Sequence, residues 1–349
     1  MNGLQSLLNT GTRLWLDSID PELVPTNKQW GITGATSNPA IVADLIRTGR
    51  FDPQIEQLIG QGINDDDVAW RLTDQLVRDA QLAFLDIWQE TDGDDGYVSF
   101  ELDPLLEDDD RGLSHEERVR QYVELGQRWS AGHNNRLIKV PATPAGIDSL
   151  SELAAAGVPL NVTLIFTSRQ YQAAREAIWQ GVQKAGLEQD FKSVYSVFVS
   201  RIDVYVNKHI PDLSEQAQGQ VAVINAKQIW RENQQFWRQK SVRLRQEIVF
   251  ASTGTKDPND DQARYVEALA GSDIQTNPPA TNEFVHQSSR SFSSQLAATL
   301  PAAVLDEIGQ RVDMTQLEVD LMDEGLAKFS QPQKDLLNLV AQKRSQLVT

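Results

Sequence analysis

Short apolar runs recur along the chain, and each has the length of a β-strand. Gly, Pro, Ser or Thr residues bound the runs, as is common where strands end. The pattern predicts strands at Arg13–Asp17, Gly31–Gly34, Tyr97–Leu102, Arg136–Val140, Leu160–Phe166, Ser193–Val199, Glu247–Ser252 and Ser272–Gln275.

Between these runs, apolar residues recur with the period of an amphipathic helix. The segment Asp65–Gln89 shows this pattern, and so does Ser114–Gly132, in which Ser114 and Glu117 have the spacing of a capping box. Further helices are predicted at Ala145–Ala156, Ser168–Ala185 and Gln216–Arg238, and near Ser293–Val312 and Gln331–Leu347.

This alternation of strands and helices favours an α/β fold, a single (β/α)8 TIM barrel with additional helices, because parallel strands need a crossover that is usually helical. The chain is longer than the roughly 250 residues typical of such barrels. We expect one domain over residues 1–349, with helical insertions at about 42–95 and 203–246 and helices at the C-terminus. The alternative is an open doubly wound sheet, but the chain has no GxGxxG or GxxxxGK[ST] loop.

Composition narrows the function further. The 349 residues include 32 basic and 49 acidic side chains, a formal net charge of −17, which argues against a nucleic-acid partner. No apolar run approaches the roughly 18 residues of a membrane helix, and the start lacks a secretory pattern, so we expect no membrane partner and a cytoplasmic protein. With no cysteine in the chain, disulfides, thiolate nucleophiles and Cys-ligated metals are excluded.

Polar residues interrupt several predicted strands, although those strands are otherwise apolar. In barrels of this kind, chemistry gathers at the C-terminal ends of the strands, and residues two apart share a face. The interrupting residues therefore point toward one site; they are Asp17, Glu101 with Ser99, Lys139, Asn161 with Thr163, and Ser196 with Phe198.

Lys139 stands within the apolar run Arg136–Pro141. Desolvation disfavours the charged form of a lysine, and a neutral amine is what a Schiff base requires. From this context alone, Lys139 could equally be a structural lysine that pairs with Glu101 or reaches solvent from the strand end. Asp17 and Glu101 are candidates for general acid–base catalysis, and each is also a candidate cap or ion-pair partner.

Ordered motifs across most of the chain resemble those of transaldolases, which are class I aldolase-type sugar-phosphate transferases. GATSNPAI (34–41) resembles the family's Thr-[Thr/Ser]-Asn-Pro signature, and RLIKVPATPAG (136–146) resembles the segment that holds its Schiff-base lysine. NVTLIFTSRQY (161–171) and SVFVSRID (196–203) are similar to the next two blocks. FELDPLL, ASTGTKDP and YVEALAGSDIQTNPPAT resemble most closely the longer actinobacterial and cyanobacterial type.

The resemblance implies a barrel with the Schiff-base lysine, Lys139, on strand 4, and no cofactor, because the protonated imine is the electron sink. It implies transfer of a dihydroxyacetone unit from fructose 6-phosphate or sedoheptulose 7-phosphate to erythrose 4-phosphate or glyceraldehyde 3-phosphate, in the non-oxidative pentose phosphate pathway. Asp17 would take the proton of the C4 hydroxyl. Glu101 would shuttle protons through a water held by Thr163.

The same resemblance assigns substrate-binding residues. Sugar hydroxyls would be held by Asn38, Asn161 and Ser196, beside Phe198, and the phosphate by Arg201, Ser252 and Lys256. Read alone, Arg201 could instead pair with Asp203. Two departures from the family pattern occur: Ser252–Lys256 reads STGTK where better-known bacterial members have Ser-Phe-Arg, and Ser200 replaces a more usual glycine.

Three alternatives to a transaldolase fit the sequence less well. A fructose-6-phosphate aldolase of the same superfamily would release dihydroxyacetone, but Glu101 and Phe198 match the transferase rather than the Gln and Tyr of that aldolase. A non-catalytic barrel would lack the lysine or the carboxylates. A metal site is not expected, since His115, His133, His209 and His286 lack HxH or HExxH spacing. We expect a monomer or homodimer whose cations Lys139, Arg201 and Lys256 make the site locally positive despite the acidic chain.

Overall fold

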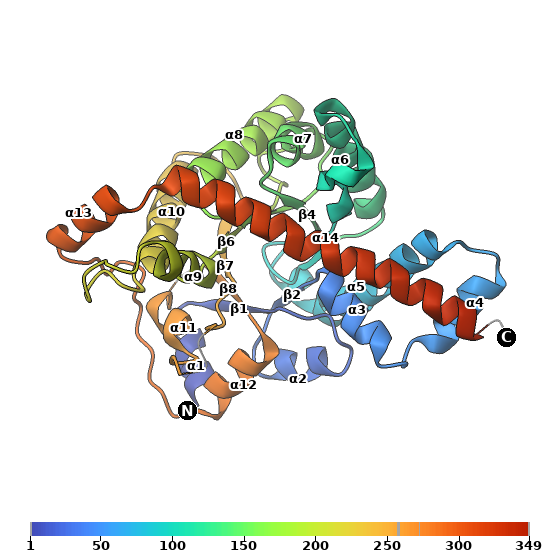
Figure 1. Cartoon of the computed structure of the whole chain (residues 1–349), viewed down its shortest axis with the longest axis horizontal. Coiled ribbons are helices and arrows are strands. Elements are labelled where there is room, and N and C mark those ends of the chain that lie inside the picture. Colours follow the sequence, from blue (N-terminus) through green and yellow to red (C-terminus); the bar gives the residue numbers. More distant parts are fainter. Residues whose placement is uncertain (1, 257–258, 272, 348–349) are drawn as a thin grey trace.

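Parallel strands close into a barrel in sequence order, from β1 to β8 and back to β1 (Figure 1). The structure is a computed structural model that describes residues 2–256, 259–271 and 273–347. Its strands are β1 (Arg13–Leu16), β2 (Gly34–Thr36), β3 (Val98–Glu101), β4 (Arg136–Pro141), β5 (Leu160–Ile165), β6 (Ser193–Phe198), β7 (Glu247–Ala251) and β8 (Ile274–Asn277). The predicted TIM-barrel fold is confirmed.

Helices alternate with the strands and continue after the last one (Figure 1). They are α1 (Gly3–Leu8), α2 (Leu23–Gln29), α3 (Pro39–Arg47), α4 (Asp52–Gly60), α5 (Asp65–Glu90), α6 (His115–Ser130), α7 (Pro144–Ala155), α8 (Ser168–Ala185), α9 (Ser200–His209), α10 (Val221–Trp237), α11 (Arg264–Ala268), α12 (Pro279–Gln287), α13 (Ala302–Arg311) and α14 (Met314–Leu347), with 3-10 turns η1 (Pro104–Glu107) and η2 (Asp109–Arg111). The predicted capping box of Ser114 and Glu117 begins α6.

Two strand predictions were displaced along the chain. The second was expected at Gly31–Gly34, but Gly31 has φ +95° and closes the turn after α2, so β2 begins only at Gly34. The eighth was expected to begin at Ser272, which lies outside the described residues. Asp273 has φ +71°, a conformation that does not continue a strand, and β8 therefore begins at Ile274.

The end of the chain differs most from its prediction. A separate last helix was predicted near Gln331–Leu347, but α14 is one helix of 34 residues with Pro332 inside it. Proline removes a backbone hydrogen bond from a helix. Here buried side chains on both sides of Pro332, among them Phe329 and Leu336, pack against the barrel and hold the helix together. The segment 293–301, also predicted helical, is not helical.

Inside the barrel, a layer of apolar side chains is followed along the strands by a layer of polar side chains. Trp15, Tyr97, Leu137, Val194, Val249 and Ile274 form a separate buried cluster. Gly34 leaves room for it, because a Cβ there would lie 2.7 Å from Trp15 Nε1. Two residues further along these strands stand polar residues such as Asp17 and Lys139. The strand period of two therefore places the polar set together, toward the C-terminal strand ends.

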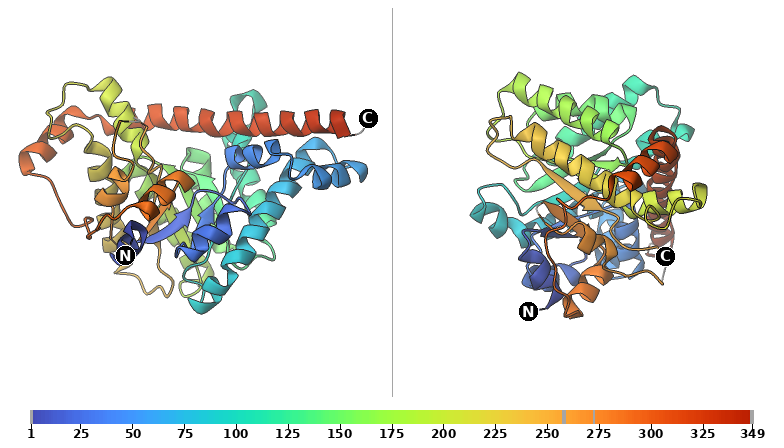
Figure 2. Two further views of the ribbon diagram at one scale, coloured as in Figure 1. Left: turned by 90° about the horizontal axis from the view of Figure 1, so that it is seen from below. Right: turned by 90° about the vertical axis from the view of Figure 1, so that its left-hand side faces the viewer.

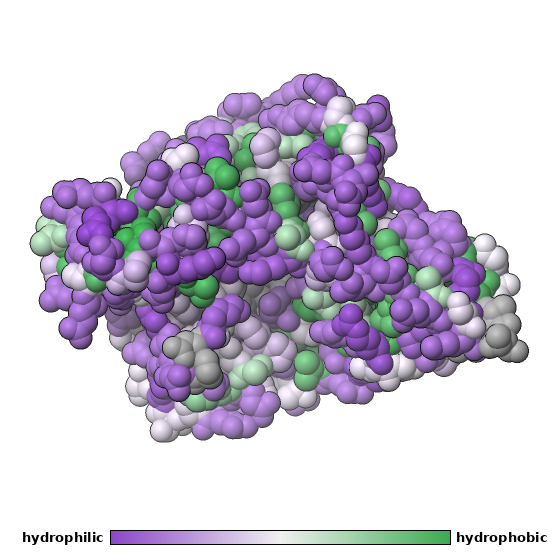
Figure 3. Space-filling view, viewed as in Figure 1, coloured by the Kyte–Doolittle hydropathy of each residue, from purple (hydrophilic) through white to green (hydrophobic). Residues whose placement is uncertain are grey.

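Helix α14 crosses the C-terminal end of the barrel (Figures 1 and 2). It packs against α3, α5, α9 and η1. At Gly325 the helix approaches the barrel closely, since a Cβ there would lie 3.2 Å from Leu164 and 3.7 Å from Arg201. The face seen in Figure 3 is mostly hydrophilic. In the described part of the chain, no helix has the length and apolar character needed to cross a membrane.

Candidate active site

A cavity of about 220 Å³ opens at the C-terminal ends of the strands, a region called the barrel mouth below. Most of the site residues predicted from the sequence line it, although they come from distant parts of the chain. These are Asp17, Asn38, Lys139, Thr163, Ser196, Phe198, Arg201, Ser252 and Lys256. The other two predicted residues, Glu101 and Asn161, are buried directly beside members of this set.

Lys139 and Glu101 form a buried pair at the ends of β4 and β3. Lys139 Nζ donates to Glu101 Oε2 at 2.9 Å and to the carbonyl of Ser37 at 3.2 Å, and the two side chains are 6% and 7% exposed. Burial raises the pKa of Glu101 to about 7, against the opposing attraction of Lys139. The ion pair considered as a structural alternative is therefore present, but it adjoins the cavity through Lys139, and a carboxyl group that titrates near neutrality can exchange protons there.

Asp17 is held in place by threonines from the neighbouring strand ends. Its Oδ1 accepts a hydrogen bond from Thr36 Oγ1 at 2.9 Å, and Thr36 lies 3.2 Å from the Thr276 hydroxyl. Asn38 has a structural role as well, because its Oδ1 accepts from Ile41 N as the N-cap of α3. The amide nitrogen of Asn38 is then left for a ligand in the cavity.

Side-chain hydrogen bonds connect β3, β5 and β6 inside the barrel. Asn161 donates to Ser99 Oγ at 2.9 Å and accepts from Ser196 Oγ at 2.7 Å. Thr163 Oγ1 is buried and has no hydrogen-bond partner among the described residues. The strict alternation predicted for this strand fails just beyond it: Leu164 has φ +56° and the register with β6 shifts, which is typical of bulges near functional sites.

Arg201 lies in the first turn of α9, where backbone N–H groups favour an anion. Burial lowers its pKa, and its Nη1 is buried with no hydrogen-bond partner in the described part of the chain. The alternative pairing of Arg201 with Asp203 is wrong, because Asp203 instead accepts from Ala222 N and the Tyr265 hydroxyl. A guanidinium group with a free buried N–H suits a phosphate oxygen.

Ser252 faces Arg201 from the end of β7. Its backbone has φ +56°, an unusual value for serine, and its hydroxyl lies 2.9 Å from the hydroxyl of Ser200. Ser200 therefore supports Ser252 directly, which gives the departure from glycine a structural consequence. The pKa of Lys256 is lowered by burial and by the positive charges of Arg201 and Lys328.

Among the lining residues that sequence reasoning missed, Lys328 and Phe329 both come from α14. The Phe329 ring centroid lies 5.4 Å from Lys139 Nζ. With Lys328 included, the lining holds four cations (Lys139, Arg201, Lys256 and Lys328) and a single carboxylate, Asp17. The lining thus agrees with the predicted local reversal of the chain's acidic charge.

The histidines occupy ordinary structural positions. His115 pairs with Asp148 at 2.8 Å, His286 stacks on Trp30, and His209 stacks on Tyr205. Within the described ranges, no group of three or more His, Cys, Asp or Glu side chains is placed to hold a metal ion.

Comparison with known proteins agrees with these observations. Residues 14–340 match the family model described as Transaldolase/Fructose-6-phosphate aldolase. The chain is 31% identical to a transaldolase of Mycobacterium tuberculosis, over 96% of this chain and 95% of that protein. It is 30% identical to "Transaldolase 2" of Streptomyces avermitilis, with the same coverage, and 30% identical to a transaldolase of Thermobifida fusca, over 97% and 98%.

Proposed function

The chain belongs to the transaldolase/fructose-6-phosphate aldolase family, and we propose that it is a transaldolase that moves a dihydroxyacetone unit between sugar phosphates through a Schiff base on Lys139. One observation carries this proposal. The Lys139 amine is buried at the end of β4, 2.9 Å from Glu101, in a cavity whose other charged groups are mostly cations.

The reaction would begin with attack of the Lys139 amine on the C2 carbonyl of a ketose phosphate, fructose 6-phosphate or sedoheptulose 7-phosphate. The carbinolamine then loses water to give the imine, and each step moves a proton. Glu101 suits this task because its pKa of about 7 lets it both donate and accept near neutral pH. The unpartnered hydroxyl of Thr163 would hold the water through which Glu101 acts.

Asp17 would then take the proton of the C4 hydroxyl. The C3–C4 bond breaks, its electrons flow into the imine to give an enamine, and the C4 fragment leaves as an aldehyde, glyceraldehyde 3-phosphate or erythrose 4-phosphate. The enamine would attack the aldehyde carbon of the second aldose phosphate, and hydrolysis of the new imine would regenerate Lys139. Asn38, Asn161 and Ser196 would orient the three-carbon unit beside Phe198.

The phosphate group would lie between Arg201, Ser252 and Lys256, at the N-terminus of α9. Arg201 supports this assignment most directly, since phosphate oxygens would satisfy its buried Nη1. No cofactor is needed for this sequence of steps. The proposal also includes a place in the non-oxidative pentose phosphate pathway, a cytoplasmic location, a single domain over the whole chain, and a monomer or homodimer.

Borohydride trapping tests the central step. Reduction in the presence of fructose 6-phosphate should fix a substrate-derived mass on the peptide that contains Lys139, as read by mass spectrometry after proteolysis. The matched control is Lys139→Arg, which keeps the positive charge but cannot form an imine at working pH. An adduct on another lysine, or an active enzyme without any adduct, contradicts the mechanism.

A coupled assay separates transferase from aldolase. Release of glyceraldehyde 3-phosphate from fructose 6-phosphate should require erythrose 4-phosphate, because the enamine needs an acceptor. Release at the same rate without that acceptor, together with free dihydroxyacetone, would identify the aldolase reaction instead.

A further inference from the structure

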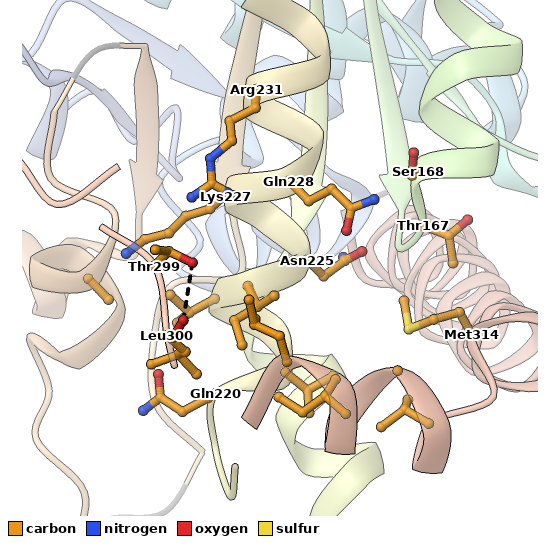
Figure 4. Close-up of a pocket in the computed structure, with 18 of the residues that line it drawn as sticks. Thr167, Ser168, Gln220, Asn225, Lys227, Gln228, Arg231, Thr299, Leu300 and Met314 are labelled. Atoms are coloured by element: carbon orange, nitrogen blue, oxygen red, sulfur yellow. Dashed lines mark hydrogen bonds between the residues drawn. The ribbon is translucent and has the colours of Figure 1, made fainter. Parts of the chain in front are cut away.

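A second and larger cavity lies outside the barrel mouth, between α10, α13, the first turns of α14 and the segment 295–300 (Figure 4). Its volume is about 840 Å³, within the range of roughly 300–1,000 Å³ found for small-molecule sites. Among the described residues, none lines both this cavity and the active-site cavity. The transfer reaction proposed above therefore leaves it unexplained.

Most of its wall is apolar. Its apolar lining includes Leu305 and Ile308 of α13, Val312 directly after that helix, Val223 and Ile224 of α10, and Leu300 and Met314. Gly309 also belongs to the wall, and a Cβ built on it would meet nothing within 4 Å. Such a wall is suited to the hydrocarbon or aromatic body of an organic molecule.

Lys227 of α10 is the exceptional residue in this wall. It is only 8% exposed, yet it makes no hydrogen bond or ion pair with any residue in the described ranges. Figure 4 shows its side chain extending from α10 toward Thr299. Burial lowers the pKa of Lys227, and so does the positive charge of Arg231 one turn further along α10.

Several other polar groups of the wall have partners. Asn225 donates to the carbonyl of Phe166, and Glu318 accepts from Thr167 and Arg169. Arg231 reaches the cavity as well and has one contact, to the carbonyl of Ala298 at 3.3 Å. The cavity thus combines an apolar body with two neighbouring cations, of which the more buried has no counter-charge.

We propose that this cavity binds an amphipathic organic anion, with its apolar body against α13 and its carboxylate, sulfonate or phosphate group on Lys227 and Arg231. Lys227 has no carboxylate partner among the described residues, and an anionic oxygen would supply a charge-assisted hydrogen bond to its ammonium group. Charge complementarity selects the ligand's sign, and the volume and apolar wall require more than a small inorganic ion. The site is independent of the Schiff-base chemistry.

Titration with 8-anilinonaphthalene-1-sulfonate (ANS) tests the proposal, because this fluorescent probe has an aromatic body and one sulfonate. We expect saturable binding to the full-length protein, weakened at least about tenfold by Lys227→Met, since a charge-assisted hydrogen bond is lost. Lys184→Met, an exposed lysine on α8 outside the cavity, is the matched control and should bind ANS as the original chain does.

Gly309→Leu provides a second variant that leaves the charges unchanged. A leucine fits the open space at this helical position and would occupy part of the cavity, so ANS binding should fall while the midpoint of thermal unfolding stays the same or rises. Unchanged ANS affinity in both Lys227→Met and Gly309→Leu overturns the proposed site.

Two further measurements locate the probe and test the sign of its charge. The neutral analogue N-phenyl-1-naphthylamine should bind equally to the original chain and to Lys227→Met. If Lys227→Met weakens both probes equally, the cavity does not select an anion. Saturating fructose 6-phosphate should not displace ANS. Displacement would place the probe in the barrel mouth. Loss of ANS binding when the protein forms a dimer would identify a second copy of the chain as the occupant. Either result overturns the proposal.

Discussion

The two ends of the barrel each bury a lysine beside a glutamate, at almost the same distance. At the mouth, Lys139 lies 2.9 Å from Glu101, and at the opposite end, Lys192 lies 2.8 Å from Glu247. We call the N-terminal ends of the strands the barrel floor. Its charged residues are Arg13, Asp94, Asp95, Lys192 and Glu247. Both pairs consist of the same residue types, so the differences between them come from their surroundings.

At the floor, the charges pair with one another. Lys192 also donates to the backbone carbonyl of Asp94 at 2.7 Å and approaches its carboxylate at 3.3 Å, and Arg13 pairs with both Glu247 and Asp95. At the mouth, by contrast, Thr163 Oγ1 and Arg201 Nη1 are buried without partners in the described ranges and adjoin a cavity. The floor charges lie against opposite charges, whereas the unpartnered groups of the mouth adjoin a cavity that can hold a ligand.

A perturbed lysine therefore does not identify the active site by itself. Burial lowers the pKa of Lys192 to about 7, although it lies at the N-terminal ends of the strands, where TIM barrels place stabilising rather than catalytic residues. The position at the C-terminal strand ends and the adjoining cavity are what distinguish Lys139.

Replacing the lysine at the mouth should give the largest effect on activity. Lys139→Met removes the nucleophile, so turnover should fall at least about 10³-fold. The midpoint of thermal unfolding should change little, because Glu101, with its pKa of about 7, takes up a proton when its partner is removed. Steady-state kinetics and a thermal scan measure the two effects. Substantial residual turnover in Lys139→Met would transfer the chemistry to another residue.

The same replacement at the floor should affect stability and leave the chemistry intact. Lys192→Met leaves Glu247 and Asp94 buried with one cation fewer, which should cost about 3–5 kcal/mol of unfolding free energy. Urea unfolding followed by tryptophan fluorescence measures this loss, and the exposed Lys184→Met should show none. Turnover per folded molecule should stay unchanged; a fall comparable to that of Lys139→Met would erase the distinction between mouth and floor.

The Glu101 carboxyl predicts a pH dependence that only the mouth should show. Below pH about 7 Glu101 is protonated, and above it Glu101 is a carboxylate that can accept a proton during formation of the imine. Activity should therefore rise with pH through about 7, roughly tenfold per unit on the acid side. The kcat/KM profile measures this limb, and Glu101→Gln should abolish it. A limb that persists in Glu101→Gln belongs to another group.

The free energy of unfolding should change with pH in the opposite direction, because of the same Glu101 carboxyl: it should fall as pH rises. The folded protein holds the Glu101 proton more tightly than the unfolded chain, where the pKa is near its ordinary 4.5. The contribution of Glu101 to stability is therefore complete below pH 4.5 and is lost as pH rises to about 7. Unfolding midpoints of the original chain and Glu101→Gln across this range provide an independent measure of the raised pKa.

The strands and the mouth residues on them were predictable because strand alternation and local motifs are short-range signals. Thr163 and Asn161 could be placed on one face from spacing alone, but the bulge at Leu164 could not, since it depends on pairing with β6. The floor network escaped notice for a related reason. Lys192, in FKSVY, and Glu247 are 55 residues apart, and only closure of the barrel brings them into contact.

Sequence patterns did not place Lys328 at the mouth, because the last helix was predicted to begin only near Gln331. Lys328 gives the test with the smallest expected effect. Lys328 is exposed, so its attraction for a phosphate is worth about 1 kcal/mol, and Lys328→Met should raise KM for erythrose 4-phosphate about fivefold. KM for unphosphorylated erythrose should not change. Lys334→Met removes a lysine of the same helix that pairs with Asp108 and Asp110 outside the cavity, and it should leave both constants unchanged. Equal effects of Lys328→Met on the two substrates would mean that α14 acts at the mouth by packing alone, through Phe329, rather than as a source of phosphate-binding charge.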